Sequence, residues 1–274
     1  MGASPPGVPV NLAKRKLRAG QLVLGHAVFE FATPGIARIL QAAGVEFALF
    51  DMEHAAFGID TIRQLVSYAR GTTVSPFVRV PTIRYEYIAA ALDVGAQGIW
   101  LPLVESREQV ERAVQATRYP PCGSRGIAYG IAHDDFTGGD LQETMRRANE
   151  EILLTAMIES KRGLENLEEI ASHPELDMVW IGHHDLAVSL GVPGDIDHPL
   201  LLEAFDRLIQ VARRHGKFAG RGVTNVASAV EWVGRGLNAI TYSRDIVVFQ
   251  TTLARHLRQV RDAVGRDGEA LSGG

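Results

Sequence analysis

Two acidic residues each follow an apolar segment of the chain, and their placement suggests a metal site. Glu159 comes directly after the apolar run 152–158, and Asp185 follows the run 178–181. If both runs are neighbouring strands of a barrel, both carboxylates project into the same mouth. Two oxygen ligands that leave positions open suit Mg²⁺ or Mn²⁺, with water and substrate completing the shell. The alternative from the residues alone is an ion pair of Glu159 with Arg162 and helix capping by Asp185.

Further polar side chains follow other apolar runs. Asp51 and His54 come after residues 47–50, and Arg79 lies near the end of residues 76–80. His54 is a candidate general base because an imidazole titrates near neutral pH. Asp51, three residues earlier, would orient that ring. Arg79 would supply a fixed positive charge at the mouth or pair with the nearby carboxylates, and His54 could equally be structural.

Three more polar residues allow two interpretations each. His183 and His184 precede Asp185 and could bind a metal or substrate, or simply form a polar loop at a helix start. Asp93 lies late in a helical pattern, which places it near the opposite face of a barrel and favours a structural role within one chain.

Lysine is scarce, and this bears on the type of chemistry. Only four of the 28 basic residues are lysines. Lys217 opens a strand and Lys161 lies where a helix begins, so neither is placed within a strand that points into a barrel. A mechanism through a covalent imine is therefore disfavoured, although the sequence leaves Lys161 open.

Eight short apolar runs alternate with helical patterns, which predicts a parallel sheet with right-handed crossovers. The predicted strands are residues 22–29, 47–50, 76–80, 98–101, 152–158, 178–181, 218–219 and 237–241. A closed (β/α)₈ barrel is the first interpretation, and an open doubly wound sheet is the second. The barrel would span residues 11–262 as a single domain, with disordered ends at 1–10 and 263–274. The long connection 118–151 is expected to carry its own helix over 141–149.

Composition excludes several classes of protein. The chain has 274 residues and a net charge of -4, which argues against a nucleic-acid binder. The single cysteine, Cys122, rules out an intrachain disulfide framework and a cysteine-based zinc cluster, and fits a cytoplasmic protein. No apolar run reaches the ~18 residues of a membrane span, so no membrane partner is expected.

Six motifs in order resemble the HpcH/HpaI aldolase family, the metal-dependent class II pyruvate aldolases. The resemblance covers about residues 11–260. The motifs are Phe50-Asp51-Met52-Glu53-His54, Val78-Arg79-Val80-Pro81, Leu92-Asp93-Val94-Gly95-Ala96, the segment 118–126, Ile158-Glu159 and Ile181-Gly182-His183-His184-Asp185-Leu186.

The resemblance implies a barrel whose last helix is exchanged with a neighbour in a homohexamer, a trimer of dimers. It implies Glu159 and Asp185 as ligands of Mg²⁺ or Mn²⁺, with Co²⁺ as a further candidate. It implies Arg79 as the group that holds the keto or enolate oxygen of a small 2-oxo acid.

Other residues receive roles from the same resemblance. His54 would be the acid/base residue, with Asp93 as its partner across a subunit interface. Arg125 would contact the far end of the substrate. Backbone N–H groups of Gly182, His183 and His184 would bind the substrate carboxylate.

The sequence departs from the family pattern at three places. His183-His184 replaces the usual Pro-Ala, Ala27 stands where many members have an aromatic residue, and Met157 replaces a common Gln. These changes leave the metal pair intact and make the acceptor substrate uncertain.

The expected reaction is reversible cleavage of a 4-hydroxy-2-oxo acid to pyruvate, or a close 2-oxo acid, and an aldehyde. An oxaloacetate decarboxylase or a citrate-lyase-like CoA-ester lyase is the alternative within the superfamily. A phosphate-binding isomerase or synthase is a second alternative, because Gly220-Arg221-Gly222 and Ser243-Arg244 follow the last two predicted strands. A non-catalytic metabolite-binding barrel is the third.

Overall fold

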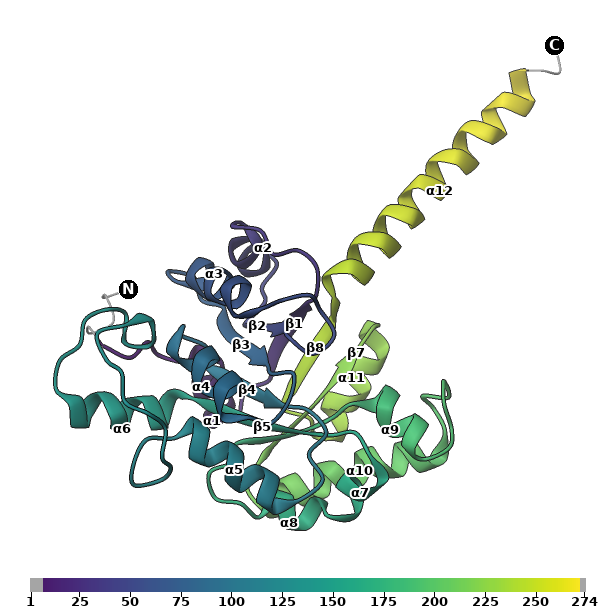
Figure 1. Cartoon of the computed structure of the whole chain (residues 1–274). Coiled ribbons are helices and arrows are strands. Elements are labelled where there is room, and N and C mark those ends of the chain that lie inside the picture. Colours follow the sequence, from purple (N-terminus) through teal and green to yellow (C-terminus); the bar gives the residue numbers. More distant parts are fainter. Residues whose placement is uncertain (1–6, 272–274) are drawn as a thin grey trace.

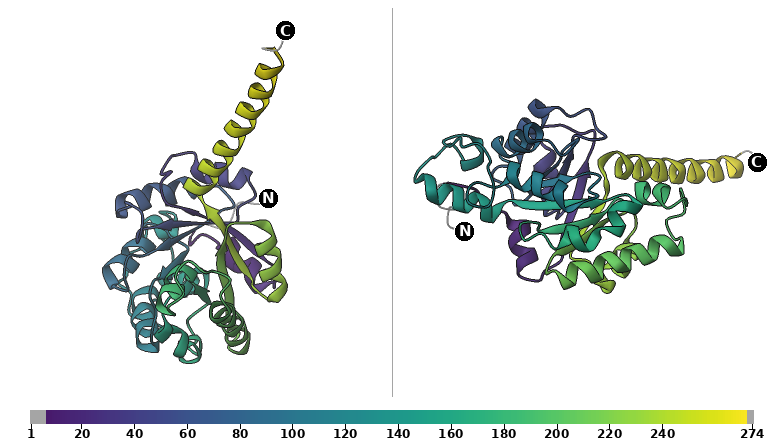
Figure 2. Two further views of the ribbon diagram at one scale, coloured as in Figure 1. Left: turned by 90° about the vertical axis from the view of Figure 1, so that its right-hand side faces the viewer. Right: turned by 60° about the horizontal axis from the view of Figure 1, so that its bottom comes forward.

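The chain folds into a closed barrel of eight parallel strands, and the predicted fold class is confirmed. The computed structural model describes residues 7–271, and side chains through residue 264. Neighbouring strands pair in chain order from β1 round to β8, which pairs with β1 (Figures 1 and 2). The strands are β1 (Val23–Val28), β2 (Phe47–Asp51), β3 (Ser75–Arg79), β4 (Gly98–Leu101), β5 (Leu153–Ile158), β6 (Met178–Ile181), β7 (Phe218–Val223) and β8 (Ala239–Arg244).

Helices surround the barrel, and several begin with a side-chain cap. Ser106 and Gln109 form both halves of a capping box at α5, and the Ser160 side chain caps α7. The helices are α1 (Leu12–Arg18), α2 (Ile36–Ala42), α3 (Ile59–Ala69), α4 (Tyr85–Asp93), α5 (Arg107–Thr117), α6 (Leu141–Glu151), α7 (Lys161–Glu165), α8 (Leu167–Ala171), α9 (His183–Ser189), α10 (Pro199–Arg214), α11 (Val226–Arg235) and α12 (Asp245–Leu271), with a 3₁₀ turn, η1 (Ala132–Asp134).

The last two strands are longer than predicted. β7 continues through Gly220-Arg221-Gly222 to Val223, and β8 continues through Ser243 and Arg244. The glycines hid the strand signal, yet Gly220 is required there. A Cβ at Gly220 would lie 2.1 Å from the indole of Trp180, so only glycine leaves room for that ring inside the barrel.

Alternating side chains of the strands build two apolar layers. One layer fills the barrel and is rich in aromatic rings. Phe47 and Phe77 stack at 5.1 Å, and the rings of Trp100 and Trp180 lie 4.2 Å apart. The other layer lies between the strands and the outer helices, and it is the larger of the two. The barrel is therefore a filled core with space only at its ends.

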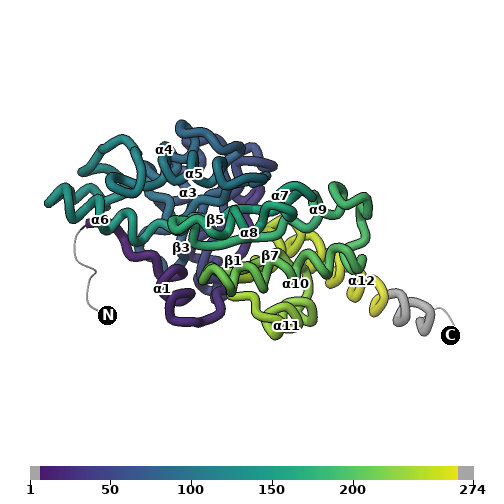
Figure 3. Tube along the Cα trace, turned by 90° about the horizontal axis from the view of Figure 1, so that it is seen from below, coloured from purple at the N-terminus to yellow at the C-terminus, as the bar shows by residue number. Residues whose placement is uncertain are grey.

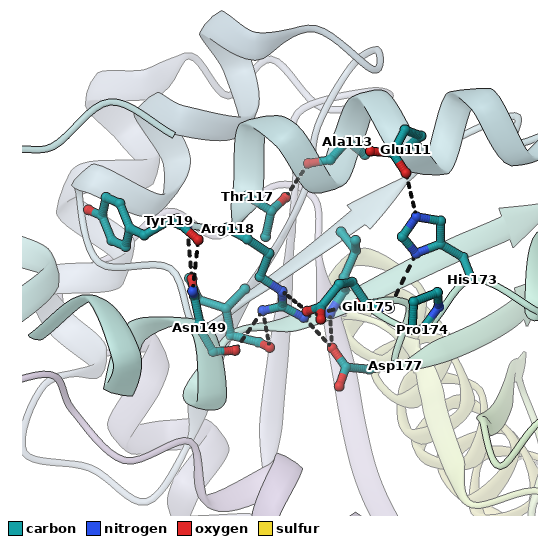
Figure 4. Close-up of polar contacts among 12 residues, drawn as sticks. Glu111, Ala113, Thr117, Arg118, Tyr119, Asn149, His173, Pro174, Glu175 and Asp177 are labelled. Atoms are coloured by element: carbon teal, nitrogen blue, oxygen red, sulfur yellow. Dashed lines mark hydrogen bonds and ion pairs between the residues drawn. The ribbon is translucent and has the colours of Figure 1, made fainter. Parts of the chain in front are cut away.

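A buried arginine joins the long connection to the starts of two strands. Arg118 follows α5, and its guanidinium donates hydrogen bonds to the carbonyl oxygens of Asn149 and Ile152 and to the carboxylate of Asp177 (Figure 4). Lys14 of α1 forms an ion pair with the other oxygen of Asp177, at 2.7 Å. These contacts hold the end of α6 and the entries to β5 and β6 together, at the opposite end of the barrel from the strand C-termini.

Parts of both predicted terminal extensions, 1–10 and 263–274, lie within the described residues. Residues 1–6 and 272–274 lie outside the described part, but Val8 is buried and its carbonyl oxygen accepts a hydrogen bond from Arg147. Near the C-terminus, α12 continues through the expected tail to Leu271. Glycine and polar residues there interrupt the apolar pattern without ending the helix.

The helix α12 begins at the end of β8 and then leaves the barrel. Phe249, in its second turn, packs edge-on against Phe31 at 5.6 Å, and later turns project away from the rest of the molecule (Figures 2 and 3). None of the helices in the described residues is long and apolar enough to cross a membrane.

Candidate active site

The C-terminal ends of the strands surround a cavity of about 190 Å³ that we call the mouth. Most of the predicted site residues line it. Those that do are His54, Arg79, Glu159, Gly182, His183, His184 and Asp185. They come from two pairs of neighbouring strands or the loops after them, β2 and β3, and β5 and β6, which explains why residues spread over 132 positions of the chain converge here.

Glu159 is the most buried acidic side chain of the mouth. It follows β5, it is 3% exposed, and one carboxylate oxygen accepts a hydrogen bond of 2.8 Å from the backbone N–H of Leu103. Burial raises its pKa to about 7, against the opposing effect of that hydrogen bond, and the charges of Glu53 and Asp185 raise it further. Gly182 approaches so closely that a Cβ there would lie 2.1 Å from a Glu159 oxygen. The alternative pairing with Arg162 is not observed.

Asp185 lies in the first turn of α9, and its side chain is exposed at the mouth. Gly182, not Asp185, occupies the position before the helix, so the alternative role as a helix cap is not observed either. The pair formed by Glu159 and Asp185 therefore presents carboxylate oxygens to the cavity from β5 and β6, as the sequence predicts.

Asp51 fixes Arg79 rather than the ring of His54. It is fully buried at the end of β2, and its two oxygens accept hydrogen bonds of 2.8 and 2.6 Å from Arg79 Nε and Nη2. The same oxygens accept the backbone N–H groups of Glu53 and His54. The prediction that Asp51 orients the imidazole is therefore wrong, because its hydrogen-bonding capacity is used by the guanidinium and the loop backbone.

Arg79 is held between two carboxylates. Besides Asp51, it has an ion pair of 3.0 Å between Nη1 and Glu53 Oε2. Burial alone would lower the pKa of Arg79, but these two carboxylates raise it, so the group stays charged. One face of the guanidinium lies 5.7 Å from the centre of the Phe29 ring. The cation is thus rigid and directed into the mouth.

His54 stands at the rim of the mouth with its imidazole about half exposed. The nearest acidic atom recorded for it is Glu53 Oε2, 3.7 Å from Nε2. Glu53 is half-buried, and burial raises its pKa, as do Asp51 and Asp185, against the opposing charge of Arg79. In the sequence, Glu53 stands out only as part of the motif 50–54. Its place between Arg79 and His54 depends on the turn after β2.

The two neighbouring histidines differ in their surroundings. His184 is exposed, whereas burial lowers the pKa of His183 to about 3, with further contributions from His184, Arg221 and Arg244. His183 is therefore neutral at physiological pH and can donate or accept a hydrogen bond without carrying a charge.

In and directly around the mouth, four carboxylates face two guanidinium groups, those of Arg79 and Arg244, and this excess of negative charge favours a bound cation. We call Asp51, Glu53, Glu159 and Asp185 the carboxylate cluster. Arg79 pairs with Asp51 and Glu53 only, so Glu159 and Asp185 have no recorded ion pair among the described residues. Buried carboxylates are costly without a counter-charge. Two oxygen ligands fit Mg²⁺ or Mn²⁺, which bind through few carboxylates and keep open positions.

The protein alone would not complete the shell of such an ion. Within the described residues, no three His, Cys, Asp or Glu side chains are arranged to hold a metal together. Any ion held by Glu159 and Asp185 would need water or substrate for its remaining ligands.

Two residues with implied catalytic roles lie elsewhere. Asp93 ends α4 and forms an ion pair of 2.5 Å with Arg125, whose guanidinium is buried against the ring of Tyr119. Neither residue lines the mouth of its own chain. The position of Asp93 agrees with its place late in a helix, and any action of Asp93 or Arg125 on the substrate would have to occur in a neighbouring subunit.

No lysine lines the mouth among the described residues. Lys161 is exposed in α7 beside Glu165, and Lys217 donates hydrogen bonds to the carbonyl oxygens of His173 and Pro174 ahead of β6. The positions of Lys161 and Lys217 outside the mouth therefore agree with the expectation that no lysine forms an imine with the substrate.

Arg221 also lies away from the mouth. Its guanidinium is buried 3.9 Å from the centre of the Phe205 ring and 4.8 Å from that of Trp232, between β7 and the outer helices. The alternation of side chains along β7 turns Arg221 towards the outer helices. Arg221 therefore cannot bind a phosphate in the mouth, which weakens the predicted phosphate-binding role of Gly220-Arg221-Gly222.

Known proteins agree with this geometry. Residues 29–249 match the model of the HpcH/HpaI aldolase/citrate lyase family. A 2-keto-3-deoxy-L-rhamnonate aldolase of Klebsiella pneumoniae is 32% identical over 96% of this chain and 97% of its own. A 5-keto-4-deoxy-D-glucarate aldolase of Shigella dysenteriae is 31% identical over 88% of this chain and 93% of its own.

A solved structure shows the same fold. The crystal structure of an HpcH/HpaI aldolase from Desulfitobacterium hafniense superposes with a TM-score of 0.87 and 32% identity, covering 90% of this chain and 96% of that one. The protein is a carbon–carbon lyase of the aldolase type. It belongs to the HpcH/HpaI aldolase/citrate lyase family.

Removing the charge of Glu159 should stabilise the metal-free protein at alkaline pH. The folded-state pKa of about 7 exceeds the ordinary 4.5, so ionised Glu159 costs stability, and the cost grows as pH rises through this window. We expect Glu159→Gln in EDTA to raise the free energy of unfolding at pH 8 by about 2–3 kcal/mol. The gain should shrink towards zero near pH 4.5.

Thermal or urea unfolding at several pH values measures this effect. Glu203→Gln, a change at an exposed position of α10, is the matched control and should show no such pH dependence. Equal stabilities of the wild type and Glu159→Gln at pH 8 would contradict the electrostatic description of the mouth.

Proposed function

We propose that the protein is a divalent-metal-dependent aldolase that reversibly cleaves a 4-hydroxy-2-oxo acid to pyruvate, or a close 2-oxo acid, and an aldehyde. One observation carries the proposal: Glu159 and Asp185 face the mouth beside the fixed cation Arg79. An aldolase must stabilise the negative charge that develops on the keto oxygen when the carbon–carbon bond breaks. This mouth offers electrostatic groups for that purpose and no lysine among the described residues.

The metal would supply one part of this stabilisation. A divalent cation held by Glu159 and Asp185 would act as a Lewis acid towards the carboxylate and keto oxygen of the 2-oxo acid, an effect worth several kcal/mol. Mg²⁺ or Mn²⁺ fits the oxygen ligands, and Co²⁺ remains a candidate.

Arg79 would supply the second part. Its guanidinium is fixed by the two hydrogen bonds that it donates to Asp51 and by the ion pair with Glu53. It can therefore face the keto oxygen without reorganising when charge develops there, which is the condition for effective electrostatic catalysis. Asp51 acts through Arg79 and is a positioning residue.

His54 is the proposed acid/base residue. Its exposed imidazole can take the proton of the C4 hydroxyl during cleavage and return it during synthesis, directly or through water. The carboxylate of the substrate would lie near the start of α9. The first turn of a helix leaves N–H groups without partners in the chain, here those that follow Gly182 at His183 and His184.

The relatives support this substrate class. Their names describe sugar-derived keto-deoxy acids, so a small 2-oxo acid with hydroxyl groups beyond the reacting carbons is the proposed substrate. The acceptor half would lie on the side of the mouth lined by Thr224, Thr241 and Ser243, whose hydroxyl groups suit such a compound.

We also propose that the chain works as a homo-oligomer with α12 exchanged between subunits, as in a hexamer. α12 carries an apolar stripe at helical spacing that is exposed in the single chain. The stripe consists of Phe249, Leu253, Leu257, Val260 and Val264. A helix with such a face needs a partner surface.

The barrel has an uncovered seam where its own last helix would be expected to lie. Leu24 and Tyr242 are exposed on the outer faces of β1 and β8, and the flanking helices add Ile39 of α2 and Val226 and Val230 of α11. Because α12 departs from this seam (Figure 2), the α12 of another subunit can cover it.

Chelation and reductive trapping test the reaction class. We expect EDTA to abolish pyruvate release from 4-hydroxy-2-oxo acids, and added Mg²⁺, Mn²⁺ or Co²⁺ to restore it. Borohydride added with pyruvate should leave the mass of the protein unchanged, because no lysine lines the mouth. A borohydride-stable pyruvyl adduct on Lys161, or full activity in EDTA, would overturn the metal-dependent mechanism.

The His54→Ala variant should lose about two to four orders of magnitude in kcat, the usual contribution of a general base. The retro-aldol assay with saturating metal measures this loss. His215→Ala removes an imidazole at the end of α10 that does not line the mouth, and it is the matched control. Unchanged cleavage by His54→Ala would remove His54 from the mechanism.

Charge introduced into the α12 stripe should dissociate the oligomer. We expect Leu253→Glu with Leu257→Glu to shift the mass measured by light scattering to that of a monomer, because both side chains would lose an apolar partner surface. Gln259→Glu, on the other side of the helix, should leave the mass unchanged. A wild-type protein that is monomeric would contradict the exchange.

A further inference from the structure

The mouth contains a second arginine that none of the roles above uses. Arg244 is the last residue of β8, it lines the same cavity as Arg79 and Glu159, and its side chain is exposed there. We infer that Arg244 binds an anionic group, a carboxylate or a phosphate, at the aldehyde end of the substrate. This inference rests on the proposed function and names the class of acceptor.

An irregularity in the sheet turns Arg244 towards the mouth. Gly25 of β1 pairs with Thr241 of β8, but Ala27 pairs with Arg244, so β8 holds one extra residue between these pairs. Such a bulge re-aims the following side chain. Paired residues of adjacent strands face the same side of the sheet, and Ala27 faces the barrel interior. Ser243, at a φ of 58°, adopts the left-handed conformation at the bulge.

The neighbouring carboxylate is not available to neutralise Arg244. Asp245 is buried, and its oxygens accept hydrogen bonds from the backbone N–H groups of Phe29, Glu30, Phe31 and Ile246. Among the described residues, no carboxylate forms an ion pair with Arg244, in contrast to Arg79, which has two. Arg244 is therefore a positive charge held at the mouth without an internal partner.

Both cations lie near the ring of Phe29, and this limits the distance between them. The guanidinium carbon of Arg79 lies 5.7 Å from the centre of the Phe29 ring, and that of Arg244 lies 5.4 Å from it. These two distances together set the upper limit of the separation between the cations. A molecule of five or six carbons, placed at one end on Arg79 and the metal pair, can reach Arg244 with its other end.

The acceptor side of the mouth is otherwise neutral. Thr241 and Ser243 contribute hydroxyl groups to it. Arg244 thus supplies the charge that distinguishes an anionic aldehyde from a neutral one. The two relatives differ in the same respect, because a glucarate-derived acid carries a second carboxylate and a rhamnonate-derived acid does not. Arg244 places this chain with enzymes that act on acids charged at both ends.

Paired aldehydes of similar shape test the assignment. Pyruvate consumption is measured with 4-oxobutanoate against butanal, and with glyceraldehyde 3-phosphate against glyceraldehyde. We expect the wild type to prefer the anionic member of at least one pair. A preference in the first pair identifies a carboxylate as the group that Arg244 binds, and a preference in the second pair identifies a phosphate. Arg244→Ala should lower kcat/KM for the preferred aldehyde by about 10- to 100-fold, with little change for its neutral partner.

Arg162→Ala is the matched control, because Arg162 is also exposed just beyond a strand but does not line the mouth. It should change neither member of a pair. Equal rates for anionic and neutral aldehydes in the wild type, or an equal loss for both in Arg244→Ala, would overturn the inference while leaving the aldolase function intact.

A binding measurement separates this inference from the proposed function. Calorimetry compares 2-oxoadipate, which carries a second carboxylate, with 2-oxohexanoate, which does not. Tighter binding of 2-oxoadipate than of 2-oxohexanoate, lost in Arg244→Ala, supports the role of Arg244. If this result is obtained but no aldehyde is turned over, only the proposed aldolase function is contradicted. Equal affinities for both acids would overturn the role of Arg244.

Discussion

Four carboxylates converge in and around the mouth of the barrel, and among the described residues one guanidinium pairs with any of them, that of Arg79, which is held by Asp51 and Glu53. The repulsion that remains falls on Glu159 and Asp185, and burial of Glu159 makes it more costly. This arrangement lowers the stability of the metal-free protein, so stability does not explain why it is present. A divalent cation bound there, as we propose, would remove this cost. The same cation would provide the Lewis acid that a carbon–carbon lyase without an active-site lysine requires.

The rest of the structure serves to hold that charge in place. The backbone N–H of Leu103 orients Glu159, and Gly182 leaves the space that the Glu159 carboxylate fills. Asp51 fixes Arg79, and Asp245 ties the loop after β1 to the end of β8 through three backbone hydrogen bonds. The charges that act on the substrate are therefore set before it binds, which is how fixed groups lower a barrier more effectively than mobile solvent.

Much of this could be predicted from the sequence, because strands that are buried on both faces appear as continuous apolar runs and acidic residues at their ends stand out. The eight strands, Glu159, Asp185 and Arg79 were accessible in this way. The hydrogen bonds of Asp51 could not be predicted in this way. Asp51 lies three residues before His54, but this spacing does not show whether the imidazole of His54 or the guanidinium of Arg79 lies nearer to it in space. The direction of the Arg244 side chain depends on a bulge in β8. A regular alternation of side chains along this strand would have turned Arg244 away from the barrel interior. The continuation of α12 through a glycine-containing segment was likewise hidden, as was the exposed stripe that composition alone does not reveal.

The central claim is that a divalent cation and the 2-oxo acid bind together between Glu159, Asp185 and Arg79. Electron paramagnetic resonance of bound Mn²⁺ in the presence of pyruvate labelled with ¹⁷O tests it most directly. The account predicts one Mn²⁺ per chain and broadening of its signal by the labelled oxygens, with both effects lost in Asp185→Ala. Mn²⁺ that binds equally well to Asp185→Ala, or a wild-type signal that the labelled pyruvate leaves unchanged, would contradict it.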